Sequence, residues 1–264
     1  MRWFVPELND TELGFYYMRY NMQVPMLGLT VGQPALVPGV GAVPIANSST
    51  YYAEYLEKRD LYGISFNTSV KGDTIFNGLS LAGELSYRPD TPIALGLAEY
   101  LPQALGLSGG FAPGTRLDGY REKDMYQASL VAIYNFTNIL GADSATFFSE
   151  VVASRVQGLE SNVDYYEATR SAYGAQASMS FNYSNVFNLF NLVPNISYQY
   201  SIKGTAPQLT NGLDEGAQSY SLGVDAIYKE SLTLGTKYVA FSGGGLTNKR
   251  TDRDFLSFNV KYSF

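Results

Sequence analysis

Two chemically versatile residue types are missing from this sequence, which contains neither cysteine nor histidine. Without them the chain cannot form a disulfide, a Cys/His zinc site, or a Ser-His-Asp or Cys-His catalytic unit. Charge is also scarce, at 16% of the 264 residues, and the net charge is −6. A basic surface for nucleic acid is therefore not expected. Carboxylate pairs such as Asp214 and Glu215 fall in predicted loops, so we expect no enzymatic activity, cofactor or metal site.

The sequence also lacks an apolar helical run that could cross a membrane. Residues 21–53 carry no charge, but Pro25, Pro34 and several glycines interrupt any helix there. Residues 171–202 are uncharged as well, yet their apolar residues alternate with polar ones instead of forming a continuous run. Alternation at period two is typical of a strand with one face buried in an apolar environment. The N-terminal residues do not resemble a secretory signal, because Pro6 and Glu7 interrupt any apolar core.

Alternation of this kind recurs along the whole chain and predicts ten strands. In the segment 252–264, for example, the apolar residues lie on one face of the predicted strand, and Ser257, Asn259 and Lys261 lie on the other. The segment 144–157 is ambiguous because apolar residues fall on both of its faces. The predicted strands are 11–22, 60–71, 76–88, 119–136, 144–157, 172–184, 194–203, 217–229, 231–242 and 252–264.

A soluble sandwich, a lipocalin-type barrel and a membrane barrel all contain alternating strands, but three features favour the membrane barrel. The apolar faces carry no charge, as a lipid-facing surface requires. Predicted connections alternate between short and long, with residues 23–59 and 89–118 as long extracellular loops, which is typical of outer-membrane barrels. Aromatic residues also bracket the apolar faces and predict a girdle at each membrane interface, formed by Tyr126, Tyr134, Tyr173, Tyr183, Tyr220 and Tyr228.

We therefore expect an all-β fold, a transmembrane antiparallel up-and-down β-barrel of the outer-membrane type, over residues 1–264. The ten strands either close by themselves or form part of a larger barrel. The last strand ends in alternating apolar residues and an aromatic, as in signals read by the barrel-assembly machinery. The residues of the predicted assembly signal are Phe258, Tyr262 and Phe264.

Polar residues opposite the apolar faces are predicted to line the lumen. They include Glu84, Asp124, Glu150, Gln176, Gln199, Lys203, Asp225, Lys237 and Lys261. These side chains either pair with one another in a filled interior or form a pore of mixed charge. Since neither sign is in excess, weak ion selectivity is expected if the pore conducts. The loop segments 51–58 and 94–106 have helical composition and are predicted to form surface helices or plugs.

Several short segments have a recognisable sequence, of which Gly83-Glu84-Leu85-Ser86-Tyr87-Arg88-Pro89 is the most specific, and others include Glu12–Met18 and Leu61–Thr68. These segments resemble the Gram-negative outer-membrane protein family catalogued as domain of unknown function 1302. The resemblance covers much of residues 11–160 and implies a longer protein, of which this chain would be the C-terminal portion of the barrel. Members of this family occur near envelope lipid-export systems, so the resemblance also implies such a system as a partner and a role in moving apolar molecules.

Two functions follow as expectations. The first is an outer-membrane barrel that passes small, hydrophobic molecules, with outer-membrane lipid, lipopolysaccharide and the barrel-assembly machinery as partners. The second is a structural or surface-interaction barrel that presents its long loops without transport. A wide lumen would favour the first function, and a narrow, filled lumen would favour the second.

Overall fold

The fold is dominated by one antiparallel sheet of eleven strands. In the computed structural model, which describes residues 1–38, 41–44, 48–108, 110–207, 212–245 and 250–263, the strands pair in the order β1-β2-β7-β8-β10-β11-β12-β13-β14-β15-β16. The order of the strands in the sheet follows their order along the chain, and neighbouring strands are antiparallel, so the sheet is of the up-and-down type. It comprises β1 (Arg2–Val5), β2 (Thr11–Tyr20), β7 (Arg59–Ser69), β8 (Ser80–Ala94), β10 (Tyr120–Ile139), β11 (Ala142–Val156), β12 (Ser171–Val186), β13 (Phe190–Lys203), β14 (Gln218–Tyr228), β15 (Leu232–Ser242) and β16 (Phe255–Tyr262).

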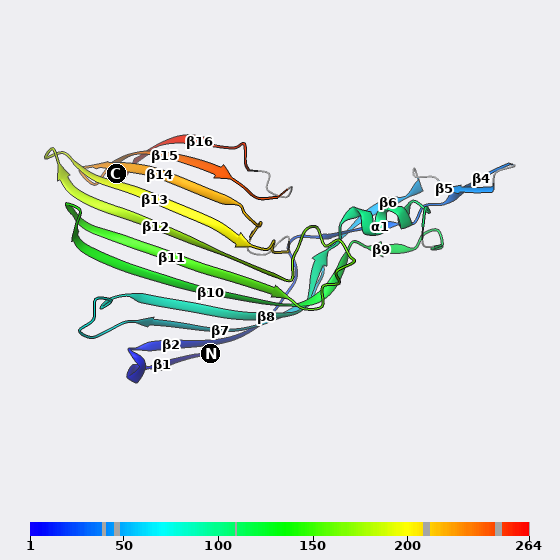
Figure 1. Ribbon diagram of the computed structural model, residues 1–264, viewed down its shortest axis with the longest axis horizontal. Helices are drawn as coiled ribbons and strands as arrows, with labels where there is room; N and C mark the ends of the chain where they lie inside the picture. Colours follow the sequence, from blue (N-terminus) through cyan, green and yellow to red (C-terminus); the bar gives the residue numbers. More distant parts are fainter. Residues whose placement is uncertain (39–40, 45–47, 109, 208–211, 246–249, 264) are drawn as a thin grey trace.

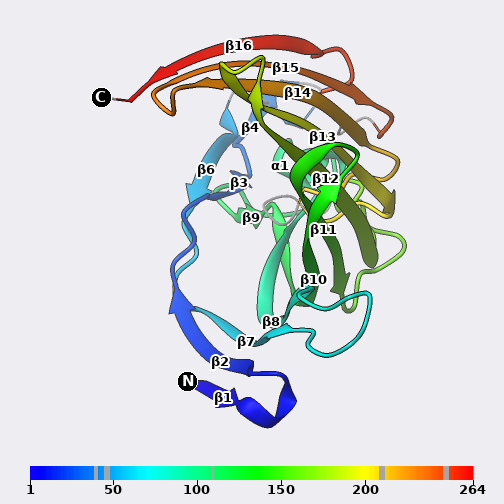
Figure 2. The same ribbon diagram turned by 90° about the vertical axis from the view of Figure 1, so that its left-hand side faces the viewer.

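The large sheet is strongly curved. Figure 2 shows its strands as an open arc, with β1 and β16 at the two edges. The ten strands predicted from alternation all occur in this sheet, with ends shifted by a few residues. The additional strand, β1, has only four residues and precedes the short 3-10 helix η1 (Pro6–Leu8), so it is too short to show alternation.

The two ends of the sheet differ as predicted. At one end, called the turn end, neighbouring strands are joined by short connections such as residues 140–141, 187–189 and 229–231. At the other, called the loop end, the connections are residues 21–58, 95–119, 157–170, 204–217 and 243–254. Tight hairpins need unusual backbone angles, and Lys229 and Glu230 accordingly have φ of 45° and 59°.

The two longest connections are folded, which corrects the prediction that 23–59 and 89–118 are loops. Residues up to Ala94 extend strand β8, and beyond it lie α1 (Leu97–Ala104) and β9 (Arg116–Asp118). Strands β3 (Met26–Thr30) and β6 (Thr50–Glu54) join β9 in a three-stranded sheet of order β6-β3-β9, and β4 (Pro34–Val37) pairs with β5 (Gly41–Pro44). Figure 1 shows these elements projecting beyond the loop end. We call them the loop subdomain.

The predicted helix at 94–106 is confirmed by α1, whereas the predicted helix at 51–58 is wrong. Residues of that segment form β6, which pairs along its length with β3. Tyr51 and Tyr52 have high strand propensity, and pairing with β3 satisfies their backbone groups. The small core of the loop subdomain contains Val31, Ala104 and Leu117.

Candidate functional site

One face of the large sheet exposes apolar side chains across its width. Leu130, Val151 and Leu222 are between 48% and 63% exposed, and Leu130 lies directly opposite Val151 on the neighbouring strand. Soluble monomers rarely expose a continuous apolar patch larger than a few hundred Å². We call this surface, which also includes Ile64 and Leu85, the apolar face.

Two belts of aromatic rings bound the apolar face. At the loop end Tyr17, Tyr62, Tyr87 and Tyr126 form a row on four adjacent strands, with successive ring centroids 5.1, 6.2 and 4.8 Å apart. At the turn end, rings pack in pairs such as Tyr134 with Phe136 and Phe190 with Tyr228.

The spacing of the belts can be compared with that of known outer-membrane barrels. Tyr126 and Tyr134 are eight residues apart on β10, which is about 26 Å along a strand and about 20 Å along a barrel axis at a tilt near 40°, somewhat less than the apolar band of about 25 Å on those barrels. Alternation and strand register place the predicted girdle residues Tyr126, Tyr134, Tyr173, Tyr183, Tyr220 and Tyr228 all on this face.

The opposite face of the sheet is polar and concave. Its serines Ser86, Ser154 and Ser201 lie near the loop end and are only 3–5% exposed, and the backbone of Ser201 also bonds to Gly216 and Ala217 of the connection 204–217. Such burial requires crowding by neighbouring side chains, which occurs on the inner side of a curved sheet. We call this surface the polar face.

Polar side chains on this face contact one another across the strands. The Gln176 amide donates to the Glu150 carboxylate at 2.5 Å, and Gln199 lies directly opposite Gln176 on the next strand. Asp225 and Asn259 both approach Gly235, which separates them on β15. The polar face therefore carries short cross-strand networks and a mixture of charges.

Most residues predicted to line the lumen lie on the polar face. Seven of them share it, namely Glu84, Glu150, Gln176, Gln199, Asp225, Lys237 and Lys261. Lys203 pairs with Tyr173 beside a register shift, so alternation does not fix its face.

The prediction for Asp124 is wrong. Asp124 lies two residues before Tyr126 on β10, so the alternation of that strand places it on the apolar face, where its carboxylate interacts with the hydroxyl of Tyr87. Met125, which is fully buried, lies on the polar face with Gln127. The register shift opposite Asp124 adds a residue to β8 and leaves the alternation of β10 unchanged, so the position of Tyr126 in the sequence already indicates the face of Asp124.

Phe258 and Tyr262 of the predicted assembly signal lie on the apolar face of β16, where they are 76% and 65% exposed. Phe264 lies outside the described residues. Recognition by the assembly machinery stays a prediction.

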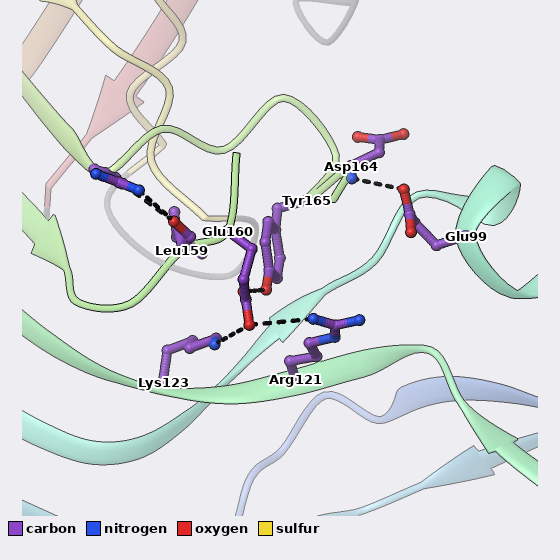
Figure 3. A network of polar contacts seen from close by, with 8 residues as sticks. Glu99, Arg121, Lys123, Leu159, Glu160, Asp164 and Tyr165 are labelled. Carbon is purple, nitrogen blue, oxygen red and sulfur yellow. Dashed lines mark hydrogen bonds and ion pairs between the residues drawn. The ribbon is translucent and has the colours of Figure 1, made fainter. Parts of the chain in front are cut away.

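At the loop end, a polar network ties the connection 157–170 to the sheet (Figure 3). Glu160 accepts hydrogen bonds from Lys123 at 2.9 Å and Arg121 at 3.2 Å, and it also accepts one from the Tyr165 hydroxyl. Hydrogen bonding from Tyr165 and then Lys123 lowers the pKa of Glu160 to about 2. The Asp164 backbone N–H donates to Glu99 of α1 at 2.8 Å. This network therefore also links the loop subdomain to the rim of the sheet.

The loop subdomain has a polar cluster of its own. The Tyr52 hydroxyl donates to Asp118 at 2.6 Å, and the Arg116 guanidinium lies 3.9 Å from the centre of the Tyr52 ring. Burial, followed by the hydrogen bond to Asp118, raises the pKa of the Tyr52 hydroxyl. Tyr52 also covers Gly28 on the paired strand, where an added Cβ would lie 2.2 Å from the ring.

Sequence reasoning missed several groups on both faces. Tyr16 belongs to the polar face and lies flat over Gly63, its cross-strand partner. Arg59 forms a 2.6 Å ion pair with Glu122 near the loop end. The row of Tyr17, Tyr62 and Tyr87 was also missed, and the signal that could have found it is one tyrosine at the loop-end terminus of each successive strand.

The described residues contain no cluster of three Asp or Glu side chains placed to hold a metal ion. Within the same residues, no helix has the length and apolar character needed to cross a membrane.

The fold and the two faces define a class of all-β protein: a curved up-and-down sheet with one apolar and one polar surface. A comparison with protein families matches residues 1–264, the whole chain, to the family described as protein of unknown function (DUF1302). The chain therefore belongs to this family. No curated protein matches the chain in a sequence search.

Proposed function

We propose that this chain forms the wall of a β-barrel in a bacterial outer membrane, with its apolar face toward lipid. The observation that supports the proposal is the apolar face, bounded by an aromatic belt at each end. Tyrosine is favoured at membrane interfaces because its ring prefers the apolar side while its hydroxyl stays hydrated. Lipid around the apolar face would remove the unfavourable contact of its side chains with water, which costs about 25 cal/mol per Å².

Closure of such a barrel would involve further strands. Eleven strands in antiparallel series place β1 and β16 in the same direction, so these two edges cannot pair with each other in the antiparallel manner. Open edges in lipid leave backbone groups unsatisfied at a cost of several kcal/mol each. An odd number of additional strands would close the barrel with antiparallel pairs throughout, and it would give a wider lumen than eleven strands alone.

The proposed activity is the passage of small molecules along the polar face. The mixed charges of Glu150, Asp225, Lys237 and Lys261 would line the path, with neither sign in excess. Weak ion selectivity is the corresponding expectation, and the family resemblance implies hydrophobic cargo.

Conductance in planar bilayers tests this activity. We expect wild-type protein to form channels of weak selectivity and Glu150→Lys to shift the selectivity toward anions. Glu230→Lys is the matched control, because it makes the same charge change in an exposed turn outside the sheet and should leave selectivity unchanged. Absence of conductance and of solute uptake into proteoliposomes that contain correctly inserted protein would refute passage.

The loop subdomain favours a second function, the presentation of a surface to lipopolysaccharide or to other cells. Its buried core and its links to the sheet rim through Glu99 are features of a folded projection rather than of a plain connection. Replacement of residues 26–54 by a Gly/Ser linker should then abolish surface binding while conductance persists. If binding and envelope integrity survive this replacement, the second function is wrong.

A further inference from the structure

The row of four tyrosines on the apolar face ends in a charged residue. Tyr126, the last ring of the row, lies directly opposite Arg155 on β11, and Arg155 is exposed. Within the described residues no ion pair to Arg155 is found. By contrast Arg19, at the other end of the row, is engaged by Asp60, with the Arg19 Nε 2.7 Å from the Asp60 carboxylate. Arg155 is therefore the cation of this row that is open to an external anion.

A carboxylate lies close to Arg155 on the same face. Asp124 precedes Tyr126 by two residues on β10, and its backbone carbonyl accepts a 2.9 Å hydrogen bond from Gln157, two residues beyond Arg155. Diagonal neighbours on paired strands are about 7–8 Å apart, which is within reach of long side chains. Asp124 is partly exposed, and its carboxylate interacts with the Tyr87 hydroxyl. A cation and an anion thus flank the end of the tyrosine row without forming an ion pair with each other.

A shallow, open apolar hollow of about 510 Å³ adjoins the tyrosine rings. It is lined by the four tyrosines of the row and by Phe15, Ile64 and Leu85, with Tyr16 and Gly63 beside them. This volume lies within the range of small-ligand sites, which is about 300–1,000 Å³. Its surface is almost entirely apolar, so it suits a hydrocarbon chain.

We propose that this place binds a phospholipid whose headgroup carries a phosphate and a primary ammonium, that is, a phosphoethanolamine lipid. The Arg155 guanidinium donates to the phosphate, the ammonium donates to Asp124, and an acyl chain occupies the hollow. Both charges of the headgroup then meet an opposite charge, which an anionic lipid or a quaternary ammonium lipid does not achieve as fully. The assignment rests on the membrane position proposed above, since the hollow faces lipid only in that position.

Titration of the purified chain in detergent with short-chain lipids, followed by native mass spectrometry, tests the site. Wild-type protein should bind phosphatidylethanolamine about tenfold more tightly than phosphatidylglycerol or phosphatidylcholine, as expected for one extra charge-assisted hydrogen bond. Arg155→Gln should weaken binding of all three lipids by about tenfold, because each contains a phosphate. Lys229→Gln, which removes one positive charge at the turn end, is the matched control and should change none of these affinities.

Asp124→Asn provides the decisive variant because it predicts a gain as well as a loss. Phosphatidylethanolamine binding should weaken, while phosphatidylglycerol binding should strengthen once the repelling carboxylate is gone. A misfolded variant cannot show this reversal. Equal effects of Asp124→Asn and Arg155→Gln on all lipids, or no effect, would overturn the site. Absence of the native protein, with the strands that close its barrel, from the bacterial outer-membrane fraction would instead refute the membrane position.

Discussion

A single arginine on the apolar face tests the lipid contact quantitatively. Leu130 is four residues from Tyr126 and four from Tyr134, so it lies midway between the two aromatic belts, and it is 48% exposed. On the surface of a soluble protein, substitution of such a residue typically changes stability by about 0.5 kcal/mol or less. At the midplane of a bilayer, an arginine on the lipid face of a barrel costs about 2–4 kcal/mol.

Leu130→Arg should therefore reduce the folding equilibrium constant in lipid by roughly 30- to 700-fold. The control is Ser129→Arg, one residue away on the polar face and directly opposite Glu84. There the new guanidinium meets a carboxylate, so we expect a loss of no more than about 0.5 kcal/mol. Urea titration in phospholipid vesicles, followed through the fluorescence of the single tryptophan, Trp3, measures both values. A loss below about 0.5 kcal/mol for Leu130→Arg, or equal losses for the two variants, would refute the lipid contact.

Three further outcomes are expected. Gly63→Ala should lower the free energy of unfolding by about 1–3 kcal/mol, because its Cβ would lie 2.0 Å from the Tyr16 ring, and Tyr16→Ala should relieve this effect in the double variant when unfolding is measured in urea. Gly28→Ala should expose the loop subdomain to trypsin by displacing Tyr52, while the heat-modifiable gel mobility of the sheet persists. Finally, the pKa of Glu160 is lowered from 4.5 to about 2. The stability that the Glu160 carboxylate gives to the connection 157–170 is therefore fully present above about pH 4.5 and is lost as the pH falls toward 2. The connection 157–170 of the wild-type protein should therefore resist an acid protease at pH 5 and be cut near pH 2. In the Glu160→Gln variant it should be cut at both pH values. If the variant resists the protease at pH 5 as the wild-type protein does, the role of Glu160 is contradicted.

The strands and their two faces could be predicted because both follow from local alternation. A strand with one apolar face leaves the same period-two pattern whether the partner strand is near or far in sequence. The predicted lining residues Glu150, Gln176 and Gln199, for example, lie in one cross-strand line although no two of them are adjacent in the chain. Tyrosine spacing likewise placed the girdle residues on the correct face.

The parts that could not be predicted depend on interactions distant in sequence. Strand β6 forms because β3 lies beside it, and the residues of 51–58 alone favoured a helix. Arg155 gains its place beside Tyr126 only through the register of β10 with β11. Such register effects decide which charges meet, and alternation contains no information about them.

The central claim, that the sheet separates lipid from a polar interior, is tested most directly by cysteine scanning along β12. Since the chain contains no native cysteine, each variant carries a single thiol. In outer membranes that contain the inserted protein, a membrane-impermeant maleimide should label cysteines at Gln176 and Ser178 and spare those at Ala175 and Ala177. A lipid-soluble maleimide should label the second pair. Equal labelling of all four positions by the impermeant reagent would contradict the claim.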